Sequence, residues 1–545
     1  MLNNIFIKYF ITILYSFIFL FVSASSQETD EIYINEIIIE SGDVFNKTDS
    51  LGFIGRAANA IHWETRDYMI EDYISLVAGE FNDTDRLLES ERVLRSTGLF
   101  TDVKIELEEL EDGSFNAYVV TKDRFTLEPA ILYGFGGGVE NIGGRLAEYN
   151  LLGTGTTLSA ELITTTENDL GFIGGMNFTI PNTFSSLVTL FGGYNSSDLN
   201  NTWRAGFVKP YFYIADGHSF GASYMKRRGD ILRYKRNEEG FVQILNETNY
   251  ARGFYSIALE KESMIYATVL VDMNYVNRDT FGFRRALDNT GSFLVSFSSH
   301  SKDFSTVKKG DYYQVQDIQT GGYGEAVLGR IFPIGRGGEQ LYYAGATGER
   351  SYYDETNYIF ARLGAGSGFA QGGAKLTFQY SDIKAFRNLN EQFVAATSFT
   401  QRTAWNWDPS RQLVLDFQSG LRGYDANSLV GDNRMISNTE IIWMPDYTRL
   451  WIFDIGVAAF FDIGSVWDTG QQITDAQWKS STGLGLRLFN SKNTGVNSIL
   501  RVDFAWSNET NSFGGIIITT GHLFSLFQNH NYRLPSIYGG NFDEF

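Results

Sequence analysis

The sequence of 545 residues contains no cysteine and only seven prolines. The lack of cysteine excludes disulfide frameworks, thiolate zinc sites, cysteine nucleophiles and an acylated lipoprotein cysteine. Histidine is scarce too, and the five histidines show no spacing typical of a metal site: His62, His218, His300, His522 and His530. Walker A and dinucleotide-binding glycine motifs are also missing. We therefore expect no cofactor and no bound metal ion.

Positive charge is in deficit. The chain has 44 Lys and Arg against 64 Asp and Glu, which gives a net charge of −20. A surface this acidic repels phosphate backbones, so we expect no nucleic-acid partner. Aromatic residues make up 15% of the chain, although its mean hydropathy is only −0.17. This aromatic content argues against intrinsic disorder, and the length allows roughly two to four domains or one very large one.

The one long apolar run lies at the N-terminus. Lys8 precedes apolar residues 10–22, and small residues follow. A basic start, a short apolar core and a small-residue exit are typical of a secretory signal peptide. The alternative, a membrane anchor, is disfavoured because a spanning helix needs about 20 residues. We expect residues 1–26 to be a signal peptide cleaved between Ala24 and Gln27, so that the mature protein is exported.

Residues 31–122 indicate a small α+β domain in the order β-α-α-β-β. Glycines end both expected helices, and Asp112-Gly113 is a strong hairpin signal. The expected elements are a strand at 32–39, helices at 65–76 and 84–96, and paired strands at 101–110 and 115–122. Such a unit would cover one face of its sheet with two helices.

From about residue 124, helical periodicity gives way to alternation of apolar and polar residues. Four clear examples are residues 454–464, 500–506, 375–380 and 413–418. In an exported chain with little proline, we interpret the apolar face as facing lipid and the polar face as lining a lumen. The alternation therefore predicts a transmembrane antiparallel β-barrel.

The length of the barrel region sets its size. Sixteen strands over residues 124–524 leave about 25 residues for each strand with its connection. The polar stretches 227–249 and 299–320 are interpreted as extracellular loops. A closing strand at 515–524 would end on the aromatic Phe524, followed by a tail, 525–545, that is periplasmic or caps the last strand.

Residues Gly217–Gly221 match the GxSxG nucleophile elbow of hydrolases. That motif needs a strand–turn–helix context, whereas the following residues 222–225 continue a strand pattern. Chance at the start of a strand is the better explanation of Ser219. We expect no catalytic residue and no enzyme activity.

Two other segments are more specific, 420–425 and 460–467. Alternation places Asp462 on the lumen face, and Arg422 lies on a loop tip flanked by glycines. A guanidinium can bind an inward carboxylate through two hydrogen bonds and so fix such a loop inside a barrel. Taken singly, each residue would be an ordinary solvated charge; the two motifs together favour a pair.

These motifs resemble the signatures of a known group, the outer-membrane assembly and secretion barrels typified by BamA, TamA and FhaC, also called the bacterial surface antigen superfamily. The LRGY loop at 421–424 and the FxDxG strand at 460–464 carry the resemblance in the barrel, and 150–155 resembles one of its early strands. Segment 79–103 is similar to the POTRA module of the same group. The residues that match are Arg422, Gly423, Tyr424 and Asp462 for a loop-6 lock, Phe460 and Gly464 for the strand motif, Gly98, Phe100, Asp102 and Val103 for POTRA, and Phe524 as the closing aromatic.

The resemblance implies one periplasmic POTRA domain and a mainly β fold with a sixteen-stranded barrel in the outer membrane of a Gram-negative cell. Its sixth extracellular loop would fold into the lumen, and its first and last strands would form a weak seam. The exposed POTRA edge, strand 101–110 or the first strand, would capture unfolded outer-membrane or secreted polypeptide clients. Further partners implied are the lipid bilayer and periplasmic chaperones or accessory proteins.

The chain also departs from that group. It has one POTRA where the essential assembly factor has several, segment 27–63 is too short for the second POTRA and plug helix of two-partner transporters, and a fused patatin-type domain is missing. The function expected is assembly or insertion of outer-membrane proteins. The alternatives are a secretion pore for a dedicated polypeptide and a passive, surface-exposed structural barrel.

Overall fold

The computed structural model describes most of the chain after the N-terminal segment. The described residues are 31–42, 62–212, 217–235, 240–260, 264–278, 285–307, 316–335, 339–407, 412–445, 449–450, 453–490, 499–508, 512–520 and 530–540. The expected signal peptide at 1–26 and the aromatic Phe524 lie outside them.

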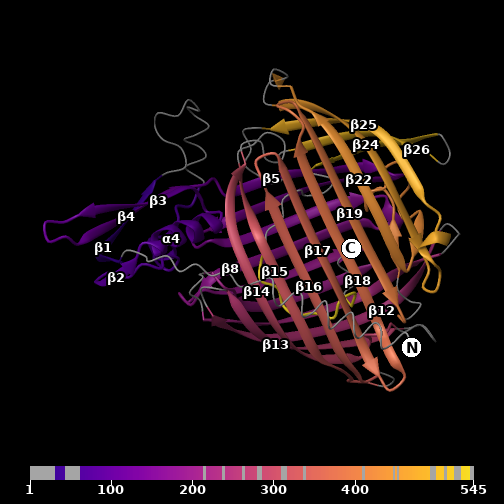
Figure 1. Ribbon diagram of the computed structural model, residues 1–545, viewed down its shortest axis with the longest axis horizontal. Coiled ribbons are helices and arrows are strands. Elements are labelled where there is room, and N and C mark those ends of the chain that lie inside the picture. Colours follow the sequence, from indigo (N-terminus) through magenta and orange to yellow (C-terminus); the bar gives the residue numbers. More distant parts are fainter. Residues whose placement is uncertain are drawn as a thin grey trace.

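The chain forms a closed antiparallel β-barrel beside a small N-terminal α+β unit (Figure 1). Within the described residues twenty strands form the ring, and the two-residue β23 (Arg449–Leu450) pairs with β24 only. The strands are β5 (Leu127–Gly136), β6 (Val139–Leu151), β7 (Thr156–Thr165), β8 (Gly171–Thr183), β9 (Val188–Ser197), β10 (Asn200–Lys209), β11 (His218–Tyr234), β12 (Phe241–Glu260), β13 (Ile265–Arg278), β14 (Thr290–Val307), β15 (Gln316–Pro333), β16 (Leu341–Tyr353), β17 (Asn357–Ala370), β18 (Gly373–Asn388), β19 (Phe393–Trp405), β22 (Asn433–Trp443), β24 (Phe453–Trp467), β25 (Lys479–Asn490), β26 (Ile499–Ser507) and β27 (Ser512–Thr520).

The predicted barrel is confirmed, but the expected number of sixteen strands is wrong. The allowance of about 25 residues for each strand with its connection was too large. Residues 127–209 hold six strands, β5 to β10, because their connections are short. The polar stretches are also not loops: β11 and β12 stay paired as far as Tyr234 and Phe241, and β14 pairs with β15 as far as Val307 and Gln316. Polar residues lengthen these hairpins without adding a strand.

Side chains alternate across most of the wall as the sequence predicts. On β24 Phe461 is 43% exposed on the outer surface, while its neighbour Asp462 is fully buried. Two predicted examples are wrong. Leu376 and Phe378 on β18 are buried on the inner face, and Leu413 belongs to a small hairpin away from the wall. Alternation alone identifies two faces but not which one meets lipid.

The N-terminal unit is a four-stranded sheet covered by helices. Its elements are β1 (Glu31–Gly42), α3 (Asp67–Glu71), β2 (Glu80–Asp83), α4 (Asp85–Ser96), β3 (Phe100–Glu109) and β4 (Phe115–Asp123), with sheet order β2-β1-β4-β3. Strand β1 runs parallel to β4, and β3 pairs with β4 as the predicted hairpin. The helices pack on the sheet through a buried core of Met69, Ile70, Val93, Leu94, Val103 and Val119. In the part of the chain described, no helix is long and apolar enough to cross a membrane.

The order differs from the expected β-α-α-β-β in two places. The first helix is reduced to five residues, and the short strand β2 precedes the second helix. Asn82 explains the added strand, because its buried side-chain amide donates to the carbonyl of Val77 while its side-chain oxygen accepts from the Val77 N–H. This local turn returns the chain to the edge of β1.

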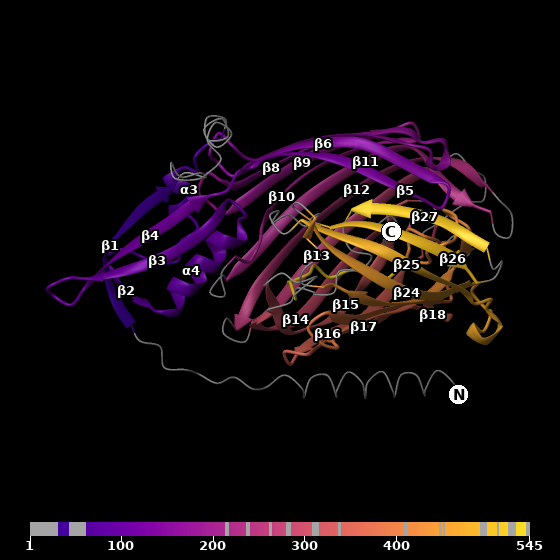
Figure 2. The ribbon, with the colours of Figure 1, turned by 90° about the horizontal axis from the view of Figure 1, so that it is seen from above.

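Hairpin turns at one end of the barrel contact the N-terminal unit (Figure 2). The N–H of Arg66 donates to the carbonyl of Gly153 at 3.0 Å, and the side-chain amide of Asn150 donates to Trp63 and Thr65. Asn150 lies near the end of β6, and Gly153 lies in the turn between β6 and β7. We name this end the domain end and the opposite one the far end. Because neighbouring strands are antiparallel, the connections β10–β11, β12–β13, β14–β15 and β16–β17 also lie at the domain end.

A charge on the outer surface tests the orientation of the wall. Leu484 near the middle of β25 is 55% exposed, and Leu152 in the turn after β6 is 58% exposed. Leu484→Lys is expected to lower the free energy of unfolding in lipid vesicles by about 2–4 kcal/mol, because lysine replaces a lipid-facing leucine. Leu152→Lys, at matched exposure, is expected to change it by less than about 1 kcal/mol. Equal effects would contradict the assignment of this surface to lipid.

Candidate functional site: a buried charge cluster under a lumen loop

The connection between β19 and β22 folds inside the barrel. It contains a hairpin of β20 (Leu413–Leu415) and β21 (Leu429–Gly431). Leu415 and Leu421 are fully buried against Ile436 of the wall. The loop is held by this apolar contact and by Asp416, whose carboxylate accepts hydrogen bonds from the N–H groups of Ser419 and Asn427.

Arg422 lies at the tip of this loop and is completely buried. Its Nε donates to Asp462 Oδ2 at 2.7 Å and its Nη2 donates to Asp462 Oδ1 at 2.8 Å. The remaining donor group, Nη1, reaches Glu440 at 2.6 Å and Asp503 at 3.2 Å. The structure thus brings together the two residues that the sequence paired, and it adds two further carboxylates.

Two more arginines complete the cluster. Arg487 donates to Asp503 at 2.6 Å and to both oxygens of Glu440 at 3.2 Å. The Nε of Arg501 lies 3.2 Å from Asp503. Three carboxylates and three guanidinium groups therefore neutralise one another in a space closed to solvent. Buried charges of one sign would be strongly unfavourable there, and pairing removes most of that cost.

Neutral groups complete the hydrogen bonding around Asp462. Asn438 donates to Asp462 Oδ1 at 2.8 Å and to the carbonyl of Gly420 at 2.6 Å, so it ties the wall to the loop backbone. The guanidinium of Arg422 also stacks over the Phe460 ring, with Cζ 3.4 Å from the centroid. Burial alone would lower the pKa of Arg422, but Asp462 and Glu440 raise it above its ordinary value, so the guanidinium stays charged.

The spacing of the FxDxG strand has a physical explanation. Phe460, Asp462 and Gly464 are alternate residues of β24 and all face the loop. Phe460 supports the guanidinium and Asp462 binds it. A Cβ on Gly464 would lie 3.0 Å from Leu415 Cδ2 and 2.9 Å from the carbonyl oxygen of Met435. Glycine at this position therefore leaves room for the loop.

The rest of the LRGY motif fixes the loop against the last strands. Gly423 has a φ of +84°, and Gly514 of β27 packs directly on its backbone. The hydroxyl of Tyr424 donates to the carbonyl of Ser480 at 3.1 Å. The loop therefore contacts β22, β24, β25, β26 and β27.

The same loop also reaches the first strand. Between β27 and β5, the register gives a single pair of residues, Ile518 and Phe135, within the described residues. Phe417 of the loop packs against Ile517 beside this seam and against the Gly136–Gly137 turn, and the N–H of Ala426 donates to the carbonyl of Gly137 at 2.9 Å. The loop thus bridges the seam from inside.

Its place in the barrel corrects the expected loop number. In a twenty-stranded ring this connection joins the fifteenth and sixteenth strands, so it is the eighth far-end loop and not the sixth. Five strands follow it, as would follow a sixth loop in a sixteen-stranded barrel. The additional strands therefore precede the loop, and its distance from the seam is the one that the resemblance implies.

The residues of the POTRA-like motif are structural. Gly98, with a φ of +75°, ends α4, and Phe100 and Val103 are buried in the core of the N-terminal unit. Asp102 is exposed on β3. The motif thus sets the turn between α4 and β3.

Ser219 of the GxSxG match lies within the continuous strand β11 and not at a strand-to-helix turn. Its buried hydroxyl donates to the carbonyl of Lys209 at 2.7 Å. The ring of the adjacent His218 bonds to Tyr255 instead. In the described ranges, no group of three or more metal-ligating side chains is close enough to hold an ion.

Sequence reasoning missed Glu440, Arg487 and the role of Asp503. The alternation already placed Arg501 and Asp503 on the polar face of one strand. Which of the many inward charges meet depends on the register between strands, which pairs Asn438 with Asp462 and Asp503 with Gly485. A rule that reads each strand separately cannot supply that register.

Comparison with models of known protein families found no match, and none of the curated proteins matched either. Solved structures similar to this chain include BamA from Haemophilus ducreyi lacking POTRA domains 1–3, with 13% identity and a TM-score of 0.43 over 90% of this chain and 83% of that one. CdiB from Acinetobacter baumannii has 11% identity and a TM-score of 0.43, over 90% of this chain and 73% of that one. CdiB from Escherichia coli has 10% identity and a TM-score of 0.42, over 92% of each chain. BamA typifies the group that the motifs resemble.

Replacing Arg422 tests the cluster. Arg422→Ala leaves Asp462 and Glu440 with too few cationic partners, so we expect the free energy of unfolding to fall by about 3–5 kcal/mol. Arg422→Lys is expected to recover only part of this loss, because an ammonium cannot reproduce the two parallel hydrogen bonds to Asp462. Urea titration of the refolded barrel in vesicles measures the free energy of unfolding of both variants.

Arg330→Ala is the matched control, because Arg330 is an exposed arginine at the far end of β15. We expect a change below about 1 kcal/mol. Arg350 would not serve as a loop control, because it lies within β16. If Arg422→Ala and Arg330→Ala have equal effects, the cluster does not hold the loop.

Proposed function

We propose that the protein is an outer-membrane assembly factor that inserts client β-strands at its barrel seam. The observation that carries this proposal is the lumen loop that bridges the junction of β27 and β5, where Phe417 packs on Ile517 and the N–H of Ala426 donates to the carbonyl of Gly137. Unpaired backbone groups at this junction would be costly in lipid. A client strand that paired with them would satisfy its own backbone at the same time.

The lumen loop makes an opening of this kind tolerable. Because Phe417 and Ala426 touch the first strand while Arg422 is bound to the later ones, the loop supports both sides of the seam. Separation of β5 from β27 would then leave the remaining strands in place. A passive structural barrel has no need of a weak seam with an internal support.

The N-terminal unit fits the role of a capture site on the periplasmic side. Its strand β3 lies at the edge of the sheet, where an extended polypeptide could pair with it. The side chains of Glu91 and Arg95 on α4 already bind the N–H of Ile105 and the carbonyl of Val103, so a client would pair beyond them or displace them. The first strand is only partly available, because β2 pairs with its outer edge over residues 31–34, whereas residues 36–42 pair with β4 on the other side. The order of strands also supports our assignment of this unit to the POTRA class.

A secretion pore is the alternative, and the filling of the lumen disfavours it. The loop around Arg422 and a C-terminal segment, residues 530–540, both pack against the inner wall. A polypeptide could pass through only after one of them moved. The proposed insertion at the seam needs no such passage and no catalytic residue.

A disulfide across the seam distinguishes the two functions. The natural chain has no cysteine, so Phe135→Cys with Ile518→Cys creates one defined pair. The oxidised variant is expected to lose insertion of client barrels into proteoliposomes, and reduction should restore it, because only the seam has been joined.

The matched control places Ile518→Cys opposite Val502→Cys, a pair within the continuous β26–β27 sheet. Its oxidation should leave insertion unchanged. Full insertion by the oxidised seam variant would refute a role for the seam and favour transport through the lumen.

Depletion of the protein in its native cell tests the range of clients. Quantitative proteomics of the outer membrane should show the loss of barrel proteins that are unrelated to one another. Loss of one secreted protein with all other barrels intact would indicate a dedicated secretion pore instead.

A further inference from the structure

The C-terminal segment 530–540 lies inside the barrel. The sequence led us to expect a tail that is periplasmic or that caps the last strand, and the structure corrects this. Tyr532 contacts Thr268 and Ser256 near the domain end, and Gly540 lies against Leu287 in the far-end connection between β13 and β14. The segment therefore runs along the lumen from one end toward the other.

The wall binds this segment partly through its backbone. The side-chain amide of Gln319 donates to the carbonyl of His530 at 3.1 Å, and its oxygen accepts from the N–H of His530 at 3.1 Å. The N–H of Tyr538 donates to the hydroxyl of Tyr343 at 2.8 Å. Contacts of this type do not depend on which side chain the bound residue carries, so they would hold other extended segments too.

Side-chain contacts add selectivity. The buried carboxylate of Glu349 accepts two hydrogen bonds from Arg533 Nη2, at 2.8 and 2.7 Å, and lies 2.8 Å from His530 Nδ1. The guanidinium of Arg533 also lies over the Tyr323 ring at 5.1 Å. A bound segment that carries an arginine at this position is therefore preferred.

A notch in the wall accommodates the ring of Tyr538. Gly345 and Gly366 face each other on β16 and β17. A Cβ added to Gly345 would lie 2.9 Å from the Tyr538 ring, and one added to Gly366 would lie 3.1 Å from it. The two glycines also make space for the wall residue Tyr343, so the notch holds one aromatic ring from the wall and one from the tail.

The inner wall around this notch is apolar, which is unusual for the lining of a water-filled lumen. The tail residues Leu534 and Ile537 cover it. The buried wall residues of the cluster include Leu270, Leu294, Val327, Ile331, Tyr343 and Phe378. Without an occupant this surface would be exposed to water, at a cost proportional to its area.

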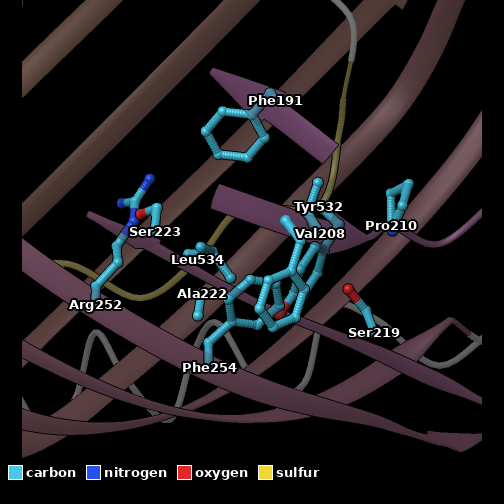
Figure 3. A pocket seen from close by; sticks show the side chains of 11 residues that line it. Phe191, Val208, Pro210, Ser219, Ala222, Ser223, Arg252, Phe254, Tyr532 and Leu534 are labelled. Carbon is cyan, nitrogen blue, oxygen red and sulfur yellow. The ribbon is translucent and has the colours of Figure 1, made fainter. Parts of the chain in front are cut away.

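The fit is incomplete on one side. A cavity of about 280 Å³ lies beside the tail, and the tail residues Tyr532 and Leu534 line it together with Val208 and Phe254 of the wall (Figure 3). A segment with larger side chains could therefore occupy the same site.

From these contacts we infer that the lumen wall from β13 to β18 is a binding site for an extended client segment that carries an arginine flanked by aromatic residues. The tail is its resident occupant and leaves when a client segment binds. The statement that the incoming segment belongs to a client rests on the proposed function. The statement that one segment replaces another in the lumen does not.

The test uses full-length protein and a labelled peptide with the sequence of residues 530–540. Arg533→Glu in the protein places a carboxylate against Glu349 and should release the tail. This variant should bind the peptide at least tenfold more tightly than the unchanged protein, in which the tail competes at a high effective concentration. Anisotropy in detergent measures the affinities.

Two controls accompany that measurement. A peptide with alanine in place of Arg533 should bind the release variant about tenfold more weakly, as expected for loss of a charge-assisted pair. In the variant Ser351→Cys with His530→Cys, whose parent side chains are hydrogen-bonded, a short thiol-reactive crosslinker with a reducible bond should fix the tail and prevent binding until reduction. Equal binding of both peptides, or equal binding by the release variant and the unchanged protein, would overturn the site.

The locked variant also separates this inference from the proposed function. If the seam disulfide stops insertion while the variant with the crosslinked tail still inserts clients, insertion at the seam is supported and the client site in the lumen is refuted. If peptide exchange occurs as described but the seam disulfide has no effect, the binding site stands and insertion at the seam is refuted. Each variant is compared with itself before and after reduction, so a folding defect cannot produce either result.

Discussion

A closed sheet in a bilayer must join its first strand to its last, because unpaired backbone groups are costly in lipid. In this barrel the loop inside the lumen contacts both sides of that junction. Arg422 binds the loop to the later strands, while Phe417 and Ala426 bind it to the end of the first. Side chains in the lumen therefore help to hold the two sides of the seam together, and they can vary without changing the lipid-facing surface.

The charge cluster suits this role better than an apolar contact would. Burying six ionised groups contributes little net stability, since desolvation offsets most of the attraction between them. What the arrangement provides is a single geometry. Asp462 accepts two parallel hydrogen bonds from Arg422. Asn438 donates to both the Asp462 carboxylate and the loop backbone, and the Phe460 ring packs against one face of the guanidinium. A hydrophobic loop of similar size could slide along the wall, whereas a displaced Arg422 would leave carboxylates unpaired.

The sequence allowed prediction of the barrel, the N-terminal α+β unit and the Arg422–Asp462 pair, because each depends on patterns within one segment. It failed where segments must be combined. Glu440 and Arg487 join the cluster through inter-strand register, and the strand number depended on how short the connections between paired strands are, as in residues 127–209. Phe378 was assigned to lipid because its strand alternates correctly, but its face is decided by the tail, which lies far away in the sequence.

The error at Phe378 has a general physical cause. In a barrel the rule that apolar residues face outward assumes that the lumen is wet, and it reverses wherever another part of the chain fills the lumen. An apolar inner wall is stable only while it is covered, so the wall from β13 to β18 and residues 530–540 depend on each other. Release of the tail alone would expose this wall to water, whereas exchange for another segment would keep it covered throughout. The most favourable path for the tail to leave the lumen is therefore replacement by an incoming chain, and the barrel remains filled when no such chain is present.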